Sequence, residues 1–363
     1  MGVYIIIFCC IFIVGVFNLR NKKYTRLVSC LFLTVLLSLV MGLRSIDYAG
    51  VDTIVYASDF NRIVDFDISF TQIFSEFYKD YFFYLSAKLF SLVCTDENIW
   101  ILFCSVVYIA AVSWLIYKYS PYIWLSYLVF VGWDFYVYNF QLIRHTWSLA
   151  FVIFAFPFLL KQDVKRYLAV MFLAINSQIV SLISIVSYAF NKLPLKRIIR
   201  FLPILVLILI FVIMVGRDTV MKWIFYFNFL SSDDRIGAFY GAKGGQLANF
   251  VINLVFLIFT TYEVVKNQKR LTPSDARIAD TLLKITVIGL IFFSLQFVVA
   301  EFYRVAQYFA IFYIILIPMA LKMERSKLIR GIIFVVLSAY LLKHFFGGIM
   351  GSPFYDPYIF FWE

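Results

Sequence analysis

Residues 42–60 read Gly42-Leu-Arg-Ser-Ile-Asp-Tyr-Ala-Gly-Val-Asp-Thr-Ile-Val-Tyr-Ala-Ser-Asp-Phe60 and open one of the few long polar segments in a very apolar chain. The segment follows directly on an apolar run, and it carries Arg44, Asp47, Asp52 and Asp59. Most of the rest consists of runs long and apolar enough to cross a membrane. The arginine and aspartates of this segment, at the water interface of a membrane protein, are therefore the first candidates for a function.

The composition is that of an integral membrane protein. The 363 residues are 63% hydrophobic and only 15% charged, with a mean hydropathy of +0.90, whereas a soluble domain is roughly half apolar and about 25% charged. The net charge of +11 comes from basic residues in short connections, as the positive-inside rule predicts. No basic and aromatic interleaving of the kind that binds single strands is present. We expect a lipid bilayer, and no nucleic acid, as a partner.

Metal and nucleotide motifs are missing from the sequence. The five cysteines form no Cys-x-x-Cys, and two histidines, His145 and His344, are too few for a zinc site. The sequence has no phosphate-binding loop, no Gly-x-Ser-x-Gly and no His-Glu-x-x-His. We therefore expect no metal and no cofactor, and an ATPase, serine hydrolase or zinc peptidase has no support.

The apolar runs predict an all-α polytopic membrane protein. Ten runs are clear spans: 2–17, 27–43, 99–116, 121–139, 146–160, 201–216, 248–265, 279–299, 303–321 and 331–346. Simple alternation through every run would place the basic 161–166 connection outside, against the positive-inside rule. If 65–94 and 167–190 instead dip in and return, every basic connection lies inside. We therefore expect about ten full transmembrane helices plus re-entrant or broken helices, with a single tilted helix over 167–190 as the alternative.

We expect one polytopic domain over residues 1–363, with loops 44–80 and 217–247 on its outer face. Apolar positions 70, 73, 74 and 77 follow helical spacing, which predicts an amphipathic helix within the first loop. Residues 176–178 (Asn-Ser-Gln) break the 167–190 run near its middle.

The placement of three arginines at the ends of spans needs an explanation, because a charge there is costly unless it is paired or in water. Arg144 and Arg304 each lie between two spans, and both share the outer face with Arg44. Singly, each has the alternative of snorkelling to the interface, and Arg304 that of pairing with Glu301. Together they predict an anion site, because guanidinium binds phosphate oxygens in a bidentate fork and keeps its charge.

Candidate proton acceptors accompany the arginines. Asp52 and Asp59 are seven residues apart and share a face if the segment is helical. His145 adjoins Arg144 and titrates near neutrality, although a histidine there is more often an interfacial hydrogen-bonding group. Asp65-Phe-Asp67 is similar to a metal-binding Asp-x-Asp motif, but a loop pair of this kind is usually just solvated.

The polar segments resemble those of one family. Gly42-Leu-Arg44…Gly50-Val-Asp52…Tyr56…Phe60 resembles the first polar loop of the EpsG-type family, which belongs with the Wzy-like polymerases of bacterial O-antigen, capsule and exopolysaccharide. Ile143-Arg144-His145 is similar to that family's Ile-Arg-Gln step, and Arg304 with Tyr308 and Pro318 is similar to its late Arg-x-x-x-Tyr…Pro span. The order runs through residues 27–320. The chain departs from the pattern at His145, usually Gln; at Ser148, usually Ala; and at Gln178, where a histidine is common.

The resemblance implies a GT-C-like membrane glycosyltransferase on the outer face of the bacterial cytoplasmic (inner) membrane. It would transfer the growing chain from undecaprenyl diphosphate to a fresh lipid-linked repeat unit. Arg44, Arg144 and Arg304 would stabilise the diphosphate, with Asp52 the first choice of base and Asp59 or His145 next. Further contacts to diphosphate or sugar are expected from Tyr56, Gln178, Arg235 and Tyr308. The partners are the lipid-linked donor and acceptor; a chain-length regulator and a flippase commonly accompany such polymerases.

Two alternatives stay open at this point. A lipid-linked sugar ligase or acyltransferase also has many spans and few motifs. A flippase or transporter of lipid-linked oligosaccharide more often has paired inverted halves with matched broken helices, and the sequence has no such repeat.

Overall fold

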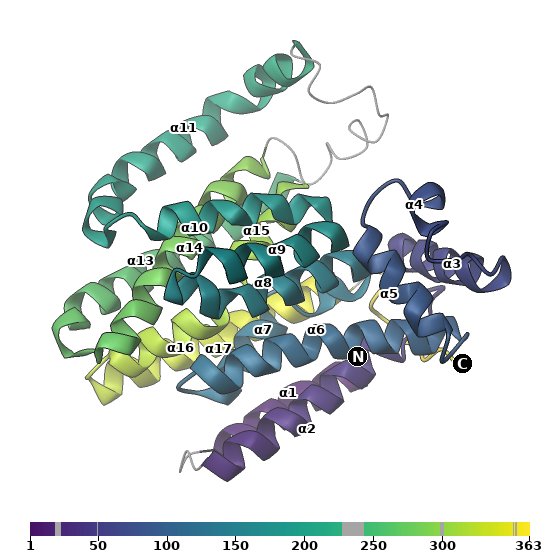
Figure 1. The fold of residues 1–363 in the computed structure, drawn as a ribbon. Coiled ribbons are helices and arrows are strands. Elements are labelled where there is room, and N and C mark those ends of the chain that lie inside the picture. Colours follow the sequence, from purple (N-terminus) through teal and green to yellow (C-terminus); the bar gives the residue numbers. More distant parts are fainter. Residues whose placement is uncertain (19–22, 49, 227–242, 298–300, 351, 353) are drawn as a thin grey trace. The chain divides into compact units, whose positions relative to one another are not determined.

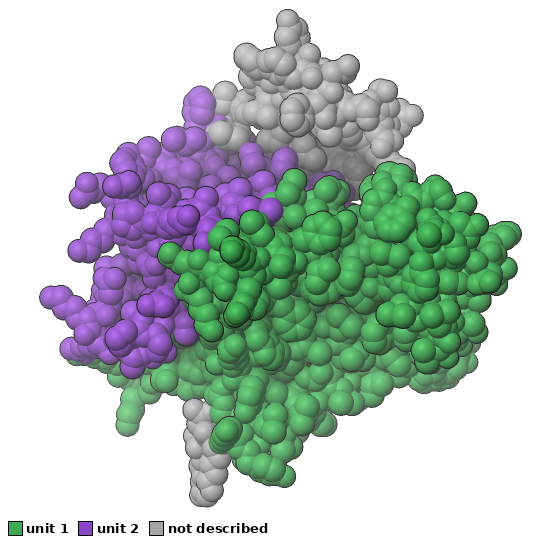
Figure 2. Space-filling view, viewed as in Figure 1, with its two compact units in different colours: residues 1–182, 317–363 green, residues 183–316 purple. Residues whose placement is uncertain are grey.

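The structure, a computed structural model, describes residues 1–363 apart from 19–22, 49, 227–242, 298–300, 351 and 353. Its described regular elements are helices, with one isolated antiparallel bridge between Arg44 and Phe360 (Figure 1). This confirms the all-α polytopic fold. The chain forms two compact units: unit 1 comprises residues 1–182 and 317–363, and unit 2 comprises residues 183–316 (Figure 2).

Unit 1 is built mainly from apolar helices. Its elements are α1 (Gly2–Phe17), α2 (Lys23–Gly42), α3 (Val51–Asp65), α4 (Ile73–Glu76), α5 (Tyr81–Ser91), α6 (Glu97–Tyr119), α7 (Ile123–Gly132), η1 (Val137–Phe140), α8 (Ile143–Lys161), α9 (Val164–Ser177) and α17 (Lys327–Ile349). The short helix η2 (Ile179–Ile185) begins in unit 1, and α16 (Tyr313–Met323) ends in it.

The α2–α6 pair forms one side of the core of unit 1. The two helices come so close at Gly42 that a Cβ there would lie 2.6 Å from the Leu102 Cα atom, so only glycine fits. At the opposite end, the Arg26 Nη2 atom donates to the carbonyls of Tyr117 (3.0 Å) and Ser120 (2.9 Å). These contacts at both ends fix how the helix that leads into the 42–60 segment lies on its neighbour.

The α8–α9 pair carries the break that the sequence predicts. The Ser148 hydroxyl of α8 donates to the Ala174 carbonyl of α9 (2.9 Å). The helix α9 ends at Ser177, Gln178 is extended (φ −159°, ψ 118°), and η2 follows. The run is therefore a broken helix and not a single tilted one.

The amphipathic helix predicted over positions 70–77 is reduced to α4, which has four residues. Asp67 adopts a left-handed backbone (φ 43°) just before this segment, and Phe77 is extended just after α4. Helical spacing of the aromatic residues did not reveal these two breaks, which leave Phe70 and Phe74 exposed.

Unit 2 contains α10 (Val186–Asn191), α11 (Leu195–Tyr226), α13 (Lys243–Asn267), η4 (Gln268–Arg270), α14 (Pro273–Leu295) and α15 (Phe302–Ala310). The helix α14 packs on the other four α-helices of this unit. The predicted 217–247 loop is helical at both described ends, because α11 continues to Tyr226 and α13 begins at Lys243. Its central residues lie outside the described part of the chain.

Six of the described helices are long and apolar enough to cross a membrane, and the pair α15–α16, bent by 45°, would make a seventh. The apolar segments 2–17, 123–132 and 179–191 are shorter. The protein is therefore a multi-pass membrane protein, while the number of about ten spans stays a prediction.

Candidate functional site

The helix α3 carries the aspartates of the opening segment. It begins after Gly50, whose φ of 97° and closeness to Gln141 leave no room for a side chain: a Cβ would lie 2.4 Å from the Gln141 Oε1 atom. Asp52 lies in the first turn, where the helix dipole favours a negative charge. Since the segment is helical, Asp52, Tyr56 and Asp59 follow one face at positions i, i+4 and i+7.

Arg144, in the first turn of α8, lies at the centre of a hydrogen-bonded chain. Its Nη1 atom donates to Asp80 Oδ2 (3.1 Å) and to the Tyr84 hydroxyl (3.2 Å). That hydroxyl in turn donates to Asp59 Oδ2 (2.8 Å). The Arg144 Cζ atom lies 5.1 Å from the centre of the Tyr56 ring. The chain Asp59–Tyr84–Arg144–Asp80 therefore joins α3, α5 and α8 at one end of unit 1.

Asp80 also holds the broken helix at this site. It precedes α5 in a left-handed conformation (φ 58°, ψ 37°), and its Oδ1 atom accepts from the Ile179 N–H (3.1 Å). Ile179 is the second residue after α9 ends. One carboxylate thus orients Arg144 and satisfies a backbone donor that the break in the helix leaves open.

Burial changes the acidity of both carboxyl groups in the chain. Desolvation raises the pKa of Asp59, although the Tyr84 hydrogen bond and the charges of Arg144 and Arg62 oppose it. Desolvation likewise raises the pKa of Asp80, against the charge of Arg144 and the hydrogen bond from Ile179. A carboxylate with a raised pKa is a better proton acceptor than a freely solvated one.

Arg44 contacts α3 about one turn of the helix away from the place where Arg144 contacts it. Its Nη2 atom donates to Thr53 Oγ1 (3.1 Å) and to the Phe140 carbonyl, and the side chain is buried (5% exposed). Thr53 and Tyr56 are three residues apart, a rise of about 4.5 Å along a helix. Two of the three predicted arginines therefore reach neighbouring turns of the same helix.

Other predicted residues are placed differently. His145 is buried (1% exposed) and, directly after Arg144, leaves α8 in a direction about 100° away from it. Gln178 is half-buried beside Ile179. Of the proposed bases, Asp59 is linked to Arg144 through the Tyr84 hydroxyl.

The remaining predicted residues belong to unit 2 or lie outside the described residues. The Arg304 Nε atom pairs with Glu301 Oε2 (3.1 Å), the pairing considered from the sequence, and Tyr308 is fully buried. Whether Arg304 and Tyr308 act with Arg44 and Arg144 stays a prediction. Arg235 lies outside the described part of the chain.

The C-terminal tail, residues 352–363, is a component that the sequence analysis missed. The Ser45 N–H donates to the Ile359 carbonyl (2.8 Å), and the Phe361 N–H donates to the Leu43 carbonyl (3.0 Å). The Tyr358 hydroxyl donates to the Val40 carbonyl (2.7 Å). The one available signal was a short aromatic segment after the last span, with four aromatic residues between 358 and 362.

Comparison with protein families gives a match that contains nearly all these residues. The model of the EpsG family matches residues 27–360, from α2 into the tail. The chain belongs to the EpsG family. EpsG proteins are Wzy-like polysaccharide polymerases, and the resemblance seen in the sequence is confirmed. Neither the curated proteins nor the solved structures contain a match to this EpsG protein.

Proposed function

We propose that this EpsG protein polymerises oligosaccharide repeat units carried on undecaprenyl diphosphate at the outer face of the bacterial cytoplasmic membrane. The observation that carries the proposal is the hydrogen-bonded chain Asp59–Tyr84–Arg144–Asp80, with Arg44 one turn away along α3. It combines a proton acceptor with cations, the two elements that glycosyl transfer from a diphosphate requires.

In the proposed reaction, a hydroxyl of the fresh lipid-linked unit attacks the anomeric carbon of the growing chain. The new C–O bond forms as the bond from that carbon to the diphosphate oxygen breaks, and the electron pair leaves with the diphosphate. Arg144 stabilises the developing negative charge, assisted, as the sequence suggests, by Arg304. The hydroxyl proton passes to an aspartate of α3.

Asp59 is the better supported of the candidate bases. Its pKa is raised by burial, and Tyr84 links it to the arginine that would bind the leaving group. Asp52, the first choice from the sequence, lies on the same face of α3 and is the second candidate. The position of His145 beside Arg144 on α8, but turned away from it, gives the histidine the least support.

The ion pair with Asp80 does not prevent Arg144 from binding phosphate. A guanidinium has five N–H donors, and Nη1 makes the bonds to Asp80 and Tyr84. Asp80 would hold the guanidinium in position while other donors bind the diphosphate. Because Asp80 is buried, losing Arg144 alone leaves an unpaired carboxylate, an event that can cost about 3–5 kcal/mol.

The test of this proposal separates catalysis from stability. We expect cells with Arg144→Gln to make glycan that stops at one repeat unit. The double variant Arg144→Gln/Asp80→Asn removes both charges, so we expect it to restore protein level but not polymerisation. Arg166→Gln is the matched control, because Arg166 is an exposed arginine that also pairs with an aspartate, Asp163 (3.5 Å). Glycan length and protein level in the membrane are measured together.

Two outcomes would contradict the proposal. A normal ladder of chain lengths in the double variant would make Arg144 a structural residue. Loss of all surface glycan, single units included, at normal protein level would indicate flipping of lipid-linked units and not their polymerisation.

A further inference from the structure

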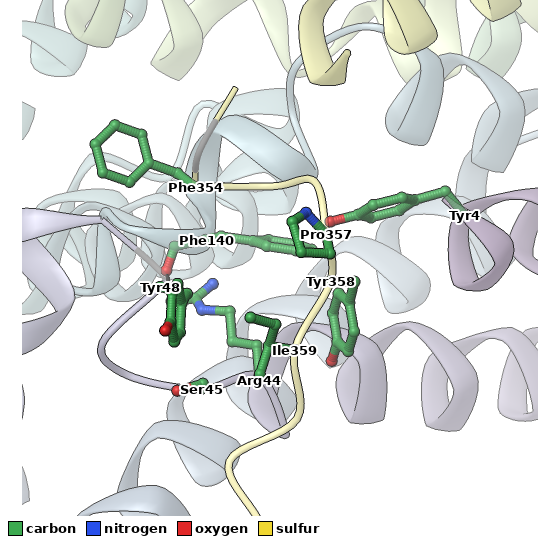
Figure 3. Close-up of a pocket in the computed structure, with 9 residues that line it drawn as sticks. All are labelled: Tyr4, Arg44, Ser45, Tyr48, Phe140, Phe354, Pro357, Tyr358 and Ile359. Atoms are coloured by element: carbon green, nitrogen blue, oxygen red, sulfur yellow. Dashed lines mark hydrogen bonds between the residues drawn. The ribbon is translucent and has the colours of Figure 1, made fainter. Parts of the chain in front are cut away.

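A small pocket beside the reaction site has Arg44 at its base. Figure 3 shows its guanidinium among the rings of Tyr48 and Phe140, with the C-terminal tail passing over it through Pro357 and Tyr358. The Arg44 Cζ atom lies 4.9 Å from the centre of the Phe140 ring. Tyr48 is 53% exposed, so the pocket opens to the surface on that side.

The guanidinium of Arg44 is buried, and two of its nitrogen atoms have no hydrogen-bond acceptor among the described residues. Nη2 bonds to Thr53 and to the Phe140 carbonyl, but Nε and Nη1 are buried and make no hydrogen bond to any described residue. Unmade hydrogen bonds of a buried charged group are expensive, so such a group points to a ligand that would complete them.

No carboxylate in the described part of the chain forms an ion pair with Arg44. The groups with the largest electrostatic effect on it are tyrosines: 355, 358, 4 and 136. Burial raises the pKa values of Tyr355 and Tyr358, so both phenols stay neutral. Burial lowers the pKa of Arg44 to about 10, which still leaves it charged at neutral pH. Arg144 differs, since Asp80 compensates its charge.

We propose that this pocket binds the carboxylate of an acidic sugar in the glycan substrate. The inference rests on the proposed function only in taking the ligand to be part of that glycan. Arg44 is the one cation among the described residues that line the pocket, so it balances a single negative charge, such as that of a carboxylate. A diphosphate carries more charge than this pocket compensates, so we assign the diphosphate to Arg144. The rings of Tyr48 and Tyr358 offer flat apolar surfaces to the sugar.

The experiment measures binding, not polymerisation, so it can fail while the glycan-length test succeeds. The full-length protein in lipid nanodiscs is titrated calorimetrically with glucuronate, glucose or pyrophosphate at millimolar concentrations. We expect glucuronate to bind and glucose not to bind. Arg44→Gln should weaken glucuronate binding about tenfold or more, because a charge-assisted hydrogen bond is lost.

Variants control for damage to the fold. Tyr48→Ala removes an exposed wall of the pocket and should weaken glucuronate binding severalfold. Tyr24→Ala, at an exposed tyrosine of α2 that does not line the pocket, should leave it unchanged. Arg166→Gln controls for the loss of one positive charge.

Three results would overturn the inference. They are the absence of glucuronate binding, equal binding of glucose and glucuronate, and glucuronate binding that survives Arg44→Gln. If pyrophosphate binds more tightly than glucuronate and this binding needs Arg44, the pocket takes the lipid diphosphate instead.

Discussion

At the scale of single residues, Asp52 and Asp59 share one face of α3 but differ in their surroundings. Asp59 accepts a hydrogen bond from Tyr84 and is buried enough for its pKa to be raised. If Asp59 is the base, Asp59→Asn should lower the rate of chain extension about 10²–10⁴-fold. Asp52→Asn, at the same face of α3, is the comparison. Full activity in Asp59→Asn membranes would move the role to Asp52.

The pH dependence follows from the direction of the Asp59 shift. A base works deprotonated, and burial favours the neutral form, so activity should fall on acidification at a pH above the ordinary aspartate pKa of about 3.9. The Tyr84 hydrogen bond lowers this pKa, so Tyr84→Phe should move the acid limb to still higher pH. Extension rates measured against pH in isolated membranes give the acid limb of the wild type and that of Tyr84→Phe. A limb that Tyr84→Phe leaves in place would contradict the assignment.

The sequence singled out Arg44, Arg144, Asp52 and Asp59 as candidates, because charges next to long apolar runs stand out. It did not identify Asp80, which is 64 residues from Arg144 and looks like any polar residue before a short helix. Pairing between distant residues depends on how helices pack, and one sequence without that packing does not contain it. The C-terminal tail was missed for the same reason.

At the scale of elements, the start of α3 sets where both arginines make contact. Gly50→Ala puts a side chain at φ 97° and against Gln141, so we expect a loss of about 1–3 kcal/mol in stability and a lower thermal midpoint in nanodiscs. Gly331→Ala in α17 is the control, because a Cβ there meets nothing within 4 Å. It should instead stabilise the helix by about 0.5–1 kcal/mol. A Gly50→Ala midpoint equal to that of the wild type would refute the argument.

The break after α9 shows what a local pattern can and cannot predict. The Asn-Ser-Gln sequence at 176–178 is polar within an apolar run, and this was enough to locate the break. The hydrogen bond from Ile179 to Asp80, which makes the break part of the site, comes from a segment 99 residues away. The amphipathic pattern at 70–77 predicted a longer helix than the structure has. The spacing of apolar residues does not reveal the backbone breaks at Asp67 and Phe77.

At the scale of the whole molecule, the two chain ends meet. The N-terminal amine lies 3.3 Å from Asp356 Oδ1 within unit 1. We therefore expect Met1 and Asp356 on one face of the membrane, which agrees with the predicted ten crossings. The positive-inside rule predicts that this face is the outer one. We expect a reporter enzyme that works only outside the membrane to be active after Glu363 and inactive in the 161–166 connection. The reverse pattern would invert the topology.

The pairing of the tail with residues 43–45 also sets an order in time. Arg44 is translated long before residues 352–363, so the pocket over Arg44 is incomplete until those residues have been added. A variant that ends before residue 352 would retain every span and every arginine named above. It would lack the C-terminal tail that passes over Arg44. Residues 352–363 therefore make the exposure of Arg44 depend on a segment that lies outside every candidate span.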